Sequence, residues 1–119
     1  MRKTQLLKGV LDGCVLELIA RKEIYGYELI QELRESGFAT IVGGTIYPLL
    51  QKLEKNKLIH SQLKSSPDGP DRKYFTITKQ GENQLDSFWQ EWQGLVTKVD
   101  RLHKGGVYDE KSDKNKSVV

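Results

Sequence analysis

The 119-residue sequence has little cysteine, little net charge and no long apolar run. Its single cysteine, Cys14, argues against an intramolecular disulfide and against a zinc site. We expect Cys14 to be a small buried residue on the apolar face of the first helix. No apolar run approaches the roughly 18 residues of a membrane span. The basic start, residues 1–3, is not followed by the apolar segment of a signal peptide. These absences predict a cytoplasmic protein with no membrane partner.

Residues that carry catalysis or hold cofactors are also scarce. The two histidines, His60 and His103, have no cysteine, histidine or carboxylate at metal-ligand spacing. The pair Gly43-Gly44 precedes a helical pattern but lacks the lysine, the further glycine and the preceding strand of a phosphate-binding loop. We therefore predict no enzymatic activity, no metal site and no cofactor. The net charge of +3 permits nucleic-acid binding but does not by itself indicate it.

What the sequence does contain is a series of short amphipathic helices. Hydrophobic residues at 37% and charged residues at 29% are typical of one mainly helical domain with a small core. Residues 4–22 predict a first helix, in which Gly9 and Gly13 are either tolerated or permit close approach by another group. Residues 25–36 predict a second helix, which Gly37 ends. Residues 38–42 are a connector.

The third predicted helix organises the rest of the chain. It should start close to Gly44 or Thr45, because glycines allow a chain reversal and Pro48 fits the first turn of a helix. We expect Asn56 to end it in the left-handed conformation. One face carries the apolar side chains Ile46, Leu49, Leu50 and Leu53. Taken alone this is an ordinary amphipathic helix, but its polar face offers hydroxyl, amide and ammonium groups.

A β-hairpin should follow this helix directly. The runs 58–63 and 72–78 favour strands, and residues 65–71 between them are dense in turn formers. The long turn predicts a mobile tip, with Arg72 and Lys73 at the base of the hairpin. Three short helices and such a wing predict a winged helix-turn-helix of mainly α (α+β) class, with a two-stranded β wing.

A heptad pattern marks the last helix, residues 79–104, for which Thr78 is the expected N-cap. Trp89 and Val96 widen its apolar stripe, and this much apolar surface indicates a homodimer. The alternative is that the helix folds back on its own domain. We thus expect a DNA-binding domain at 1–78, a dimerisation helix at 79–104 and a disordered polar tail at 105–119. The predicted dimerisation residues are Leu85, Phe88, Trp92, Leu95, Val99 and Leu102.

Double-stranded DNA is the predicted partner, since an α-helix fits the major groove. The side chains expected to read bases are Thr45, Tyr47, Gln51 and Lys52. The expected phosphate contacts are Lys52, Lys55, Arg72 and Lys73. A dimer would place two such helices about one DNA turn apart on a pseudo-palindromic operator. The alternative function is a winged-helix protein-interaction adaptor without sequence-specific DNA binding.

Three motifs resemble the PadR family of bacterial transcription regulators. Residues 44–54 (GTIYPLLQKLE) are similar to the family's recognition helix, and residues 25–29 (YGYEL) to its second helix. Residues 72–81 (RKYFTITKQG) resemble its wing strand and the start of its dimer helix. Two positions depart from the family pattern. Lys57 stands where glycine is usual, so Asn56 is expected to make that turn, and residues 69–71 replace the commoner Gly-Gly-Arg.

The resemblance implies a winged-helix repressor that dimerises through its C-terminal helix. The short length is similar to the subfamily that includes repressors of multidrug transporters, which bind flat aromatic compounds at the dimer interface. Trp92 falls where such a regulator has a tryptophan that stacks on its ligand, and Trp89 is a second candidate contact. A small aromatic or hydrophobic effector is therefore a possible partner. The alternative is that both tryptophans only fill the dimer core.

Overall fold

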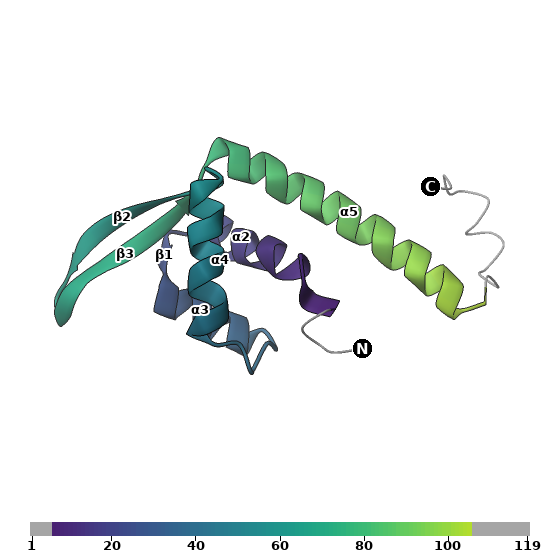
Figure 1. Cartoon of the computed structure of the whole chain (residues 1–119), viewed down its shortest axis with the longest axis horizontal. Helices are drawn as coiled ribbons and strands as arrows, with labels where there is room; N and C mark the ends of the chain where they lie inside the picture. The colour runs from purple at the N-terminus through teal and green to yellow at the C-terminus, as the bar shows by residue number, and fades with distance from the viewer. Residues whose placement is uncertain (1–5, 106–119) are drawn as a thin grey trace. The chain divides into compact units, whose positions relative to one another are not determined.

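The computed structural model describes residues 6–105 and divides the chain into two compact units, one ending at Asp86 and the other beginning at Ser87. The predicted polar tail lies outside the described residues, except for its first residue. Figure 1 shows the helices and strands along the chain. They are α2 (Val10–Arg21), β1 (Ile24–Tyr25), α3 (Gly26–Glu35), α4 (Gly43–Lys55), β2 (Ile59–Ser66), β3 (Gly69–Ile77) and α5 (Lys79–His103). No helix among residues 6–105 is long and apolar enough to cross a membrane.

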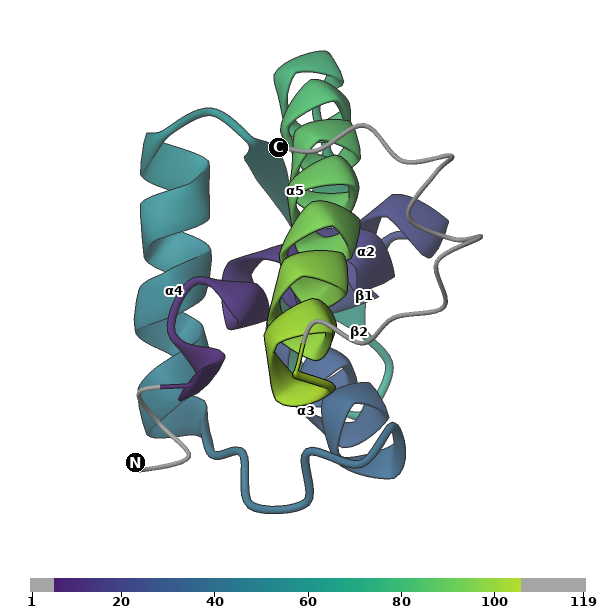
Figure 2. The ribbon, with the colours of Figure 1, turned by 90° about the vertical axis from the view of Figure 1, so that its right-hand side faces the viewer.

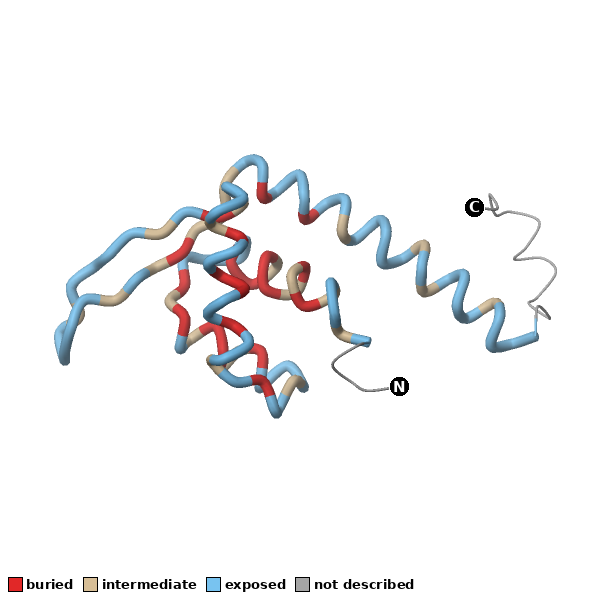
Figure 3. The backbone as a smooth tube through the Cα atoms, viewed as in Figure 1, coloured by how far each residue is buried: buried red, intermediate tan, exposed pale blue. Residues whose placement is uncertain are grey.

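The core of the first unit forms where α2, α3, α4 and the base of the sheet meet (Figure 3). The apolar stripe predicted for α4 is confirmed, because Ile46, Leu49, Leu50 and Leu53 are all at most 8% exposed. Figure 2 shows the connector that carries the chain from the end of α3 to the start of α4. The winged helix fold predicted from the sequence is confirmed.

The first helix differs from the sequence prediction. Residues 4–5 lie outside the described residues, residues 6–7 are helical, and a turn at Lys8 and Gly9 then interrupts the helix before α2 begins. Gly9 has a φ of 86°, which only glycine adopts readily. The prediction of one continuous helix over 4–22 was therefore wrong. Cys14, predicted to be buried, is only partly buried, and burial raises the pKa of its thiol, with a smaller contribution from the Glu17 carboxylate.

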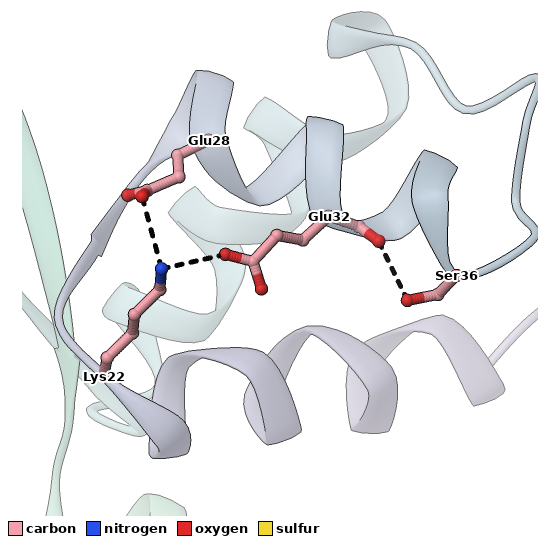
Figure 4. Close-up of polar contacts among 4 residues, drawn as sticks. All are labelled: Lys22, Glu28, Glu32 and Ser36. Carbon is pink, nitrogen blue, oxygen red and sulfur yellow. Dashed lines mark hydrogen bonds and ion pairs between the residues drawn. The ribbon is translucent and has the colours of Figure 1, made fainter.

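Helices α2 and α3 are joined by an ion-pair network at the end of α2 (Figure 4). The Lys22 ammonium lies 3.1 Å from a carboxylate oxygen of Glu32 and 3.3 Å from one of Glu28. Hydrogen bonds from the ammonium to Glu32 and then Glu28 raise the pKa of Lys22. At the other end of α3, the Ser36 hydroxyl donates to the Glu32 carbonyl at 2.9 Å.

The predicted two-stranded wing is present as the hairpin of β2 and β3, and a short strand that was not predicted, β1, joins it in one three-stranded antiparallel sheet. Its order is β1-β3-β2, and the short β1 pairs with β3 through Ile24↔Phe75 and Tyr25↔Tyr74. A strand of two residues carries too little pattern to be recognised in a sequence.

The hairpin turn also differs from the prediction. Ser66 still pairs with Gly69, so the turn contains only Pro67 and Asp68. The strands therefore extend through most of the segment that we predicted to be a long mobile loop. Figure 1 shows the resulting hairpin reaching away from helices α2, α3 and α4.

Candidate nucleic-acid interface

Helix α4 is set by the turns at its two ends. It begins at Gly43, one residue before the predicted start, with Val42 as an N-cap that makes no side-chain cap hydrogen bond. Its first turn contains no acidic residue, so the positive end of the helix dipole is not neutralised there. Its last turn carries Lys52 and Lys55, which complement the negative end.

The C-terminal end of α4 corrects a sequence prediction. Asn56 keeps a negative φ of −84°, and Lys57 takes the left-handed conformation with a φ of 64°. The Lys57 amide donates to the Glu54 carbonyl at 2.9 Å, and the Leu58 amide donates to the Leu53 carbonyl at 3.0 Å. This pair of hydrogen bonds defines a Schellman motif, in which the residue after the C-cap must be left-handed. Because Asn56 is the C-cap itself, the turning role falls to Lys57.

Burial of one stripe decides which α4 side chains point outward. Successive side chains of an α-helix are rotated by about 100°. The direction opposite the buried stripe is shared by Gly44, Pro48, Gln51 and Lys55, all of which are exposed. Gln51 and Lys55 therefore lie at the centre of the outer face. The other predicted contacts lie on its two flanks.

Thr45 and Lys52 form the flank that faces α2. Both line a groove of about 710 Å³, together with Leu11, Asp12 and residues of the α3–α4 connector. The Lys52 ammonium lies 2.8 Å from the Asp12 carboxylate, across this groove. No local pattern in the sequence indicates this pair, since the two residues are 40 positions apart.

Tyr47 and Glu54 form the opposite flank. The Tyr47 side chain is 47% exposed, and its ring lies against the backbone of Gly26 and Gly43. A Cβ atom placed on Gly26 would be 2.5 Å from the Tyr47 ring, and one on Gly43 would be 3.0 Å from it. Tyr47 is thus partly a packing residue, and its other side remains open to a ligand.

Glu54 ties α4 to the wing. Its carboxylate accepts a hydrogen bond from the Ser61 hydroxyl at 2.5 Å and lies 3.6 Å from the Lys73 ammonium. The Ser61 hydrogen bond, followed by the charges of Lys73 and His60, lowers the pKa of Glu54 against the opposing effect of burial. Glu54 therefore stays ionised at neutral pH and fixes the wing against the helix.

Arg72 and Lys73 lie in the middle of β3 and face opposite sides of the sheet, because strand side chains alternate. Lys73 faces α4, as its ion pair with Glu54 shows. Arg72 stacks on the Tyr25 ring, with 4.5 Å between the guanidinium carbon and the ring centroid. The sequence prediction placed both residues at the base of the hairpin, whereas they lie in the middle of β3 and on opposite faces of the sheet.

A row of cations and aromatic rings covers the Arg72 side of the wing. The Tyr25 and Tyr74 rings meet edge to face at 5.4 Å. Lys64 lies over Tyr74 at 5.5 Å and pairs with the Glu23 carboxylate at 2.6 Å. These contacts hold the hairpin to β1, so part of the positive charge of the wing is engaged within the chain.

The second unit carries the predicted apolar stripe. Of the predicted dimerisation residues, Leu85 lies in the first unit and is buried within the single chain. Phe88 is half-buried and packs edge to face on Trp89 at 5.0 Å. Among residues 87–105, the exposed large apolar side chains are Trp89, Trp92, Leu95, Val99 and Leu102. The stripe that is available to a partner therefore begins after Leu85.

Within residues 6–105, no three histidine, cysteine or acidic side chains are grouped so that they could hold a metal ion. What the structure does present is a helix exposed on one polar face, beside a hairpin with basic side chains. This combination defines a winged helix-turn-helix protein of the DNA-binding class.

The chain belongs to the PadR-like family of transcriptional regulators, whose model matches residues 15–87. It is similar to a transcriptional regulator from Streptococcus, with 62% identity, a TM-score of 0.77 and coverage of 85% of this chain and 99% of that one. It is also similar to a PadR-like transcriptional regulator from Bacillus cereus, with 49% identity, a TM-score of 0.75 and coverage of 82% and 95%. An uncharacterized protein of Lysinibacillus sphaericus is 34% identical, with coverage of 88% of this chain and 98% of that protein. The family consists of DNA-binding regulators and not of enzymes.

Proposed function

We propose that this PadR-like regulator is a homodimeric repressor that reads a pseudo-palindromic operator with the outer face of α4. The observation that supports this most strongly is the division of α4 into a buried apolar stripe and an exposed polar face. A helix anchored in this way can enter the major groove without losing its contacts to the core.

The residues of α4 take different roles according to their position. Gln51 and Lys55, at the centre of the outer face, would contact a base edge and a phosphate respectively. Thr45 and Lys52 would reach the strand nearest α2, and Tyr47 would offer its hydroxyl to a phosphate on the other flank. Each phosphate contact adds to the salt dependence of binding. Lys73 and Arg72 on the wing would add further contacts from the two sides of the hairpin.

The homodimer is supported by the exposed stripe of the second unit. Trp92 is 37% exposed and Leu95 is 52% exposed, which is a large apolar surface for one helix to leave in water. Pairing with the same helix of a second copy would cover this stripe and hold two α4 helices at a fixed separation. A small aromatic or hydrophobic effector that lodges beside Trp92 or Trp89 would change this separation and release the operator.

The first experiment measures binding to DNA from the chain's own upstream promoter at two salt concentrations, with random duplex DNA as the reference. Lys55→Ala should weaken binding and reduce its salt dependence by about one phosphate contact per subunit. Lys98→Ala removes the same charge from an exposed position on α5 and should have no comparable effect. Equal affinity for promoter and random DNA would contradict an operator at this site and would favour the adaptor function.

The dimer and the effector are tested without DNA. Leu95→Lys should shift the protein from dimer to monomer in sedimentation, whereas Gln90→Lys, on the far side of α5 from the stripe, should not. An aromatic dye such as anilinonaphthalene sulfonate should quench tryptophan fluorescence in the wild type, and Trp92→Ala should weaken its binding more than Trp89→Ala. A wild-type monomer would contradict the dimer, and dye binding unchanged by either substitution would contradict the effector site.

A further inference from the structure

The Asp12–Lys52 ion pair joins α2 to the helix that is proposed to read DNA. We propose that Asp12 is an electrostatic brake on DNA binding, because it holds the Lys52 ammonium that a phosphate would otherwise recruit. This inference rests on the proposed function and assigns to α2 a part in setting the affinity. Its ligand is the phosphate backbone of duplex DNA.

The geometry favours competition between the Asp12 carboxylate and a DNA phosphate for the Lys52 ammonium group. The distance of 2.8 Å between Lys52 Nζ and Asp12 Oδ2 is that of a charge-assisted hydrogen bond. Both side chains line the groove between α2 and α4, and the Lys52 side chain is 54% exposed, so an approaching phosphate can reach it. DNA must therefore displace a carboxylate before Lys52 can contribute.

Asp12 occupies a position that suits a carboxylate. It lies in the first turn of α2, where a carboxylate is stabilised by the positive end of the helix dipole. Its carboxylate also stays near the DNA after the ion pair breaks, and it then repels the phosphate that has taken Lys52. The competition for Lys52 and the repulsion of the phosphate both lower the affinity for DNA.

The expected size of the effect follows from the exposure of the pair. Exposed ion pairs are weak, and breaking one corresponds to about a two- to fivefold change in an equilibrium constant. In a dimer that binds two half-sites, this factor in the equilibrium constant applies once at each half-site. We therefore expect Asp12→Asn to tighten binding of the dimer by about four- to 25-fold.

A positioning role for Asp12 would change the DNA affinity of the Asp12→Asn variant in the opposite direction. If Asp12 instead positions Lys52 for its phosphate contact, Asp12→Asn would weaken binding. A general effect of removing one negative charge could also be distinguished from the proposed role, because it would not depend on Lys52. The experiment therefore compares the wild type with Asp12→Asn, Lys52→Gln and the double variant.

The measured quantity is the dissociation constant for promoter DNA and for a random duplex of equal length, at one fixed salt concentration. Because the contact is to phosphate, the gain from Asp12→Asn should occur on both DNAs. It should fall below twofold in the Lys52→Gln background. Glu17→Gln is the matched control, since it removes an α2 carboxylate of similar exposure that pairs with Arg21 rather than with α4. This control should leave the affinity within twofold of the wild type.

The outcomes separate the brake from the proposed function. If the wild type binds DNA and Asp12→Asn shows no gain in affinity, or a loss, the proposed role of Asp12 is overturned and the proposed function is unaffected. A gain that persists in the Lys52→Gln background, or that Glu17→Gln reproduces, would overturn it as well. Absence of DNA affinity in every variant would overturn both proposals.

Discussion

Gly26 and Tyr47 are packed against each other, although the two residues are 21 positions apart in the chain and belong to different motifs. The backbone of Gly26, at the start of α3, faces the Tyr47 ring so closely that a Cβ atom would lie 2.5 Å from it. The Tyr-Gly-Tyr and Gly-Thr-Ile-Tyr motifs are thus two halves of one contact. This contact sets the position of the α4 start relative to α3.

We predict that Gly26→Ala destabilises the protein because of this contact. The added methyl group forces the tyrosine ring or the start of α3 to move, which should cost about 1–3 kcal/mol. The measurement is the free energy of unfolding by denaturant at a fixed protein concentration. In a Tyr47→Ala background the same substitution should cost much less, since the ring is gone. Equal costs in the two backgrounds would show that the ring is not the obstacle.

The left-handed turn after α4 predicts a stabilising substitution. Lys57 has a φ of 64°, whereas Gly37 occupies the equivalent position after α3 with a φ of 119° and the same pair of backbone hydrogen bonds. Lys57→Gly relieves the strain of a side chain in this region and should raise the free energy of unfolding by about 1 kcal/mol. Asn56→Gly is the control, because Asn56 has a negative φ and gains nothing. A larger gain from Asn56→Gly would place the turn one residue earlier.

Two glycines of α5 predict opposite effects of the same substitution. A Cβ atom on Gly81 would collide with the Leu58 carbonyl oxygen and the Ile77 side chain, whereas one on Gly94 would meet nothing within 4 Å. Gly94→Ala should therefore stabilise the helix by about 0.5–1 kcal/mol. Gly81→Ala should destabilise the protein by at least 1 kcal/mol. Thermal unfolding at equal protein concentration tests both, and effects of the same sign would contradict the packing described for Gly81.

The lowered pKa of Glu54 predicts how the attachment of the wing responds to acid. Because the folded-state pKa of Glu54 lies below its unfolded-state value, its stabilising contribution is present above the unfolded pKa and is lost as the pH falls through the folded pKa. Ser61→Ala removes the largest cause and should raise the pKa of Glu54 toward its usual value. Lys73→Met should raise it less. NMR titration of the Glu54 carboxylate measures both shifts, and a larger effect of Lys73→Met would reverse the order of the two causes.

The outer face of α4 and the fold around it could be predicted from local patterns. The stripe of Ile46, Leu49, Leu50 and Leu53 repeats at helical spacing, so it predicted which face is buried and which is free. Gly37 and Thr78 carried terminal signals that the structure bears out. Gly37 follows α3 in the left-handed conformation, and the Gly81 amide donates to the Thr78 hydroxyl at 2.9 Å.

The features that were missed depend on groups far apart in the sequence. The strand β1 exists because β3 pairs with it, and two residues alone show no period. Asp12 meets Lys52, and Ser61 and Lys73 meet Glu54, through packing that no local signal encodes. The tight turn at Pro67 and Asp68 follows from a pairing register that continues to Ser66 and Gly69.

The sequence by itself determined helices α3, α4 and α5, the two strands of the wing and the class of protein, because apolar periodicity and turn residues act over a few positions along the chain. Tertiary structure alone decided which α4 side chains are free and which are held. Lys52 is paired with a carboxylate of α2, Tyr47 lies on Gly26, and Gln51 and Lys55 face outward. Such pairings depend on distances across the core, and these distances exist only once the elements have packed.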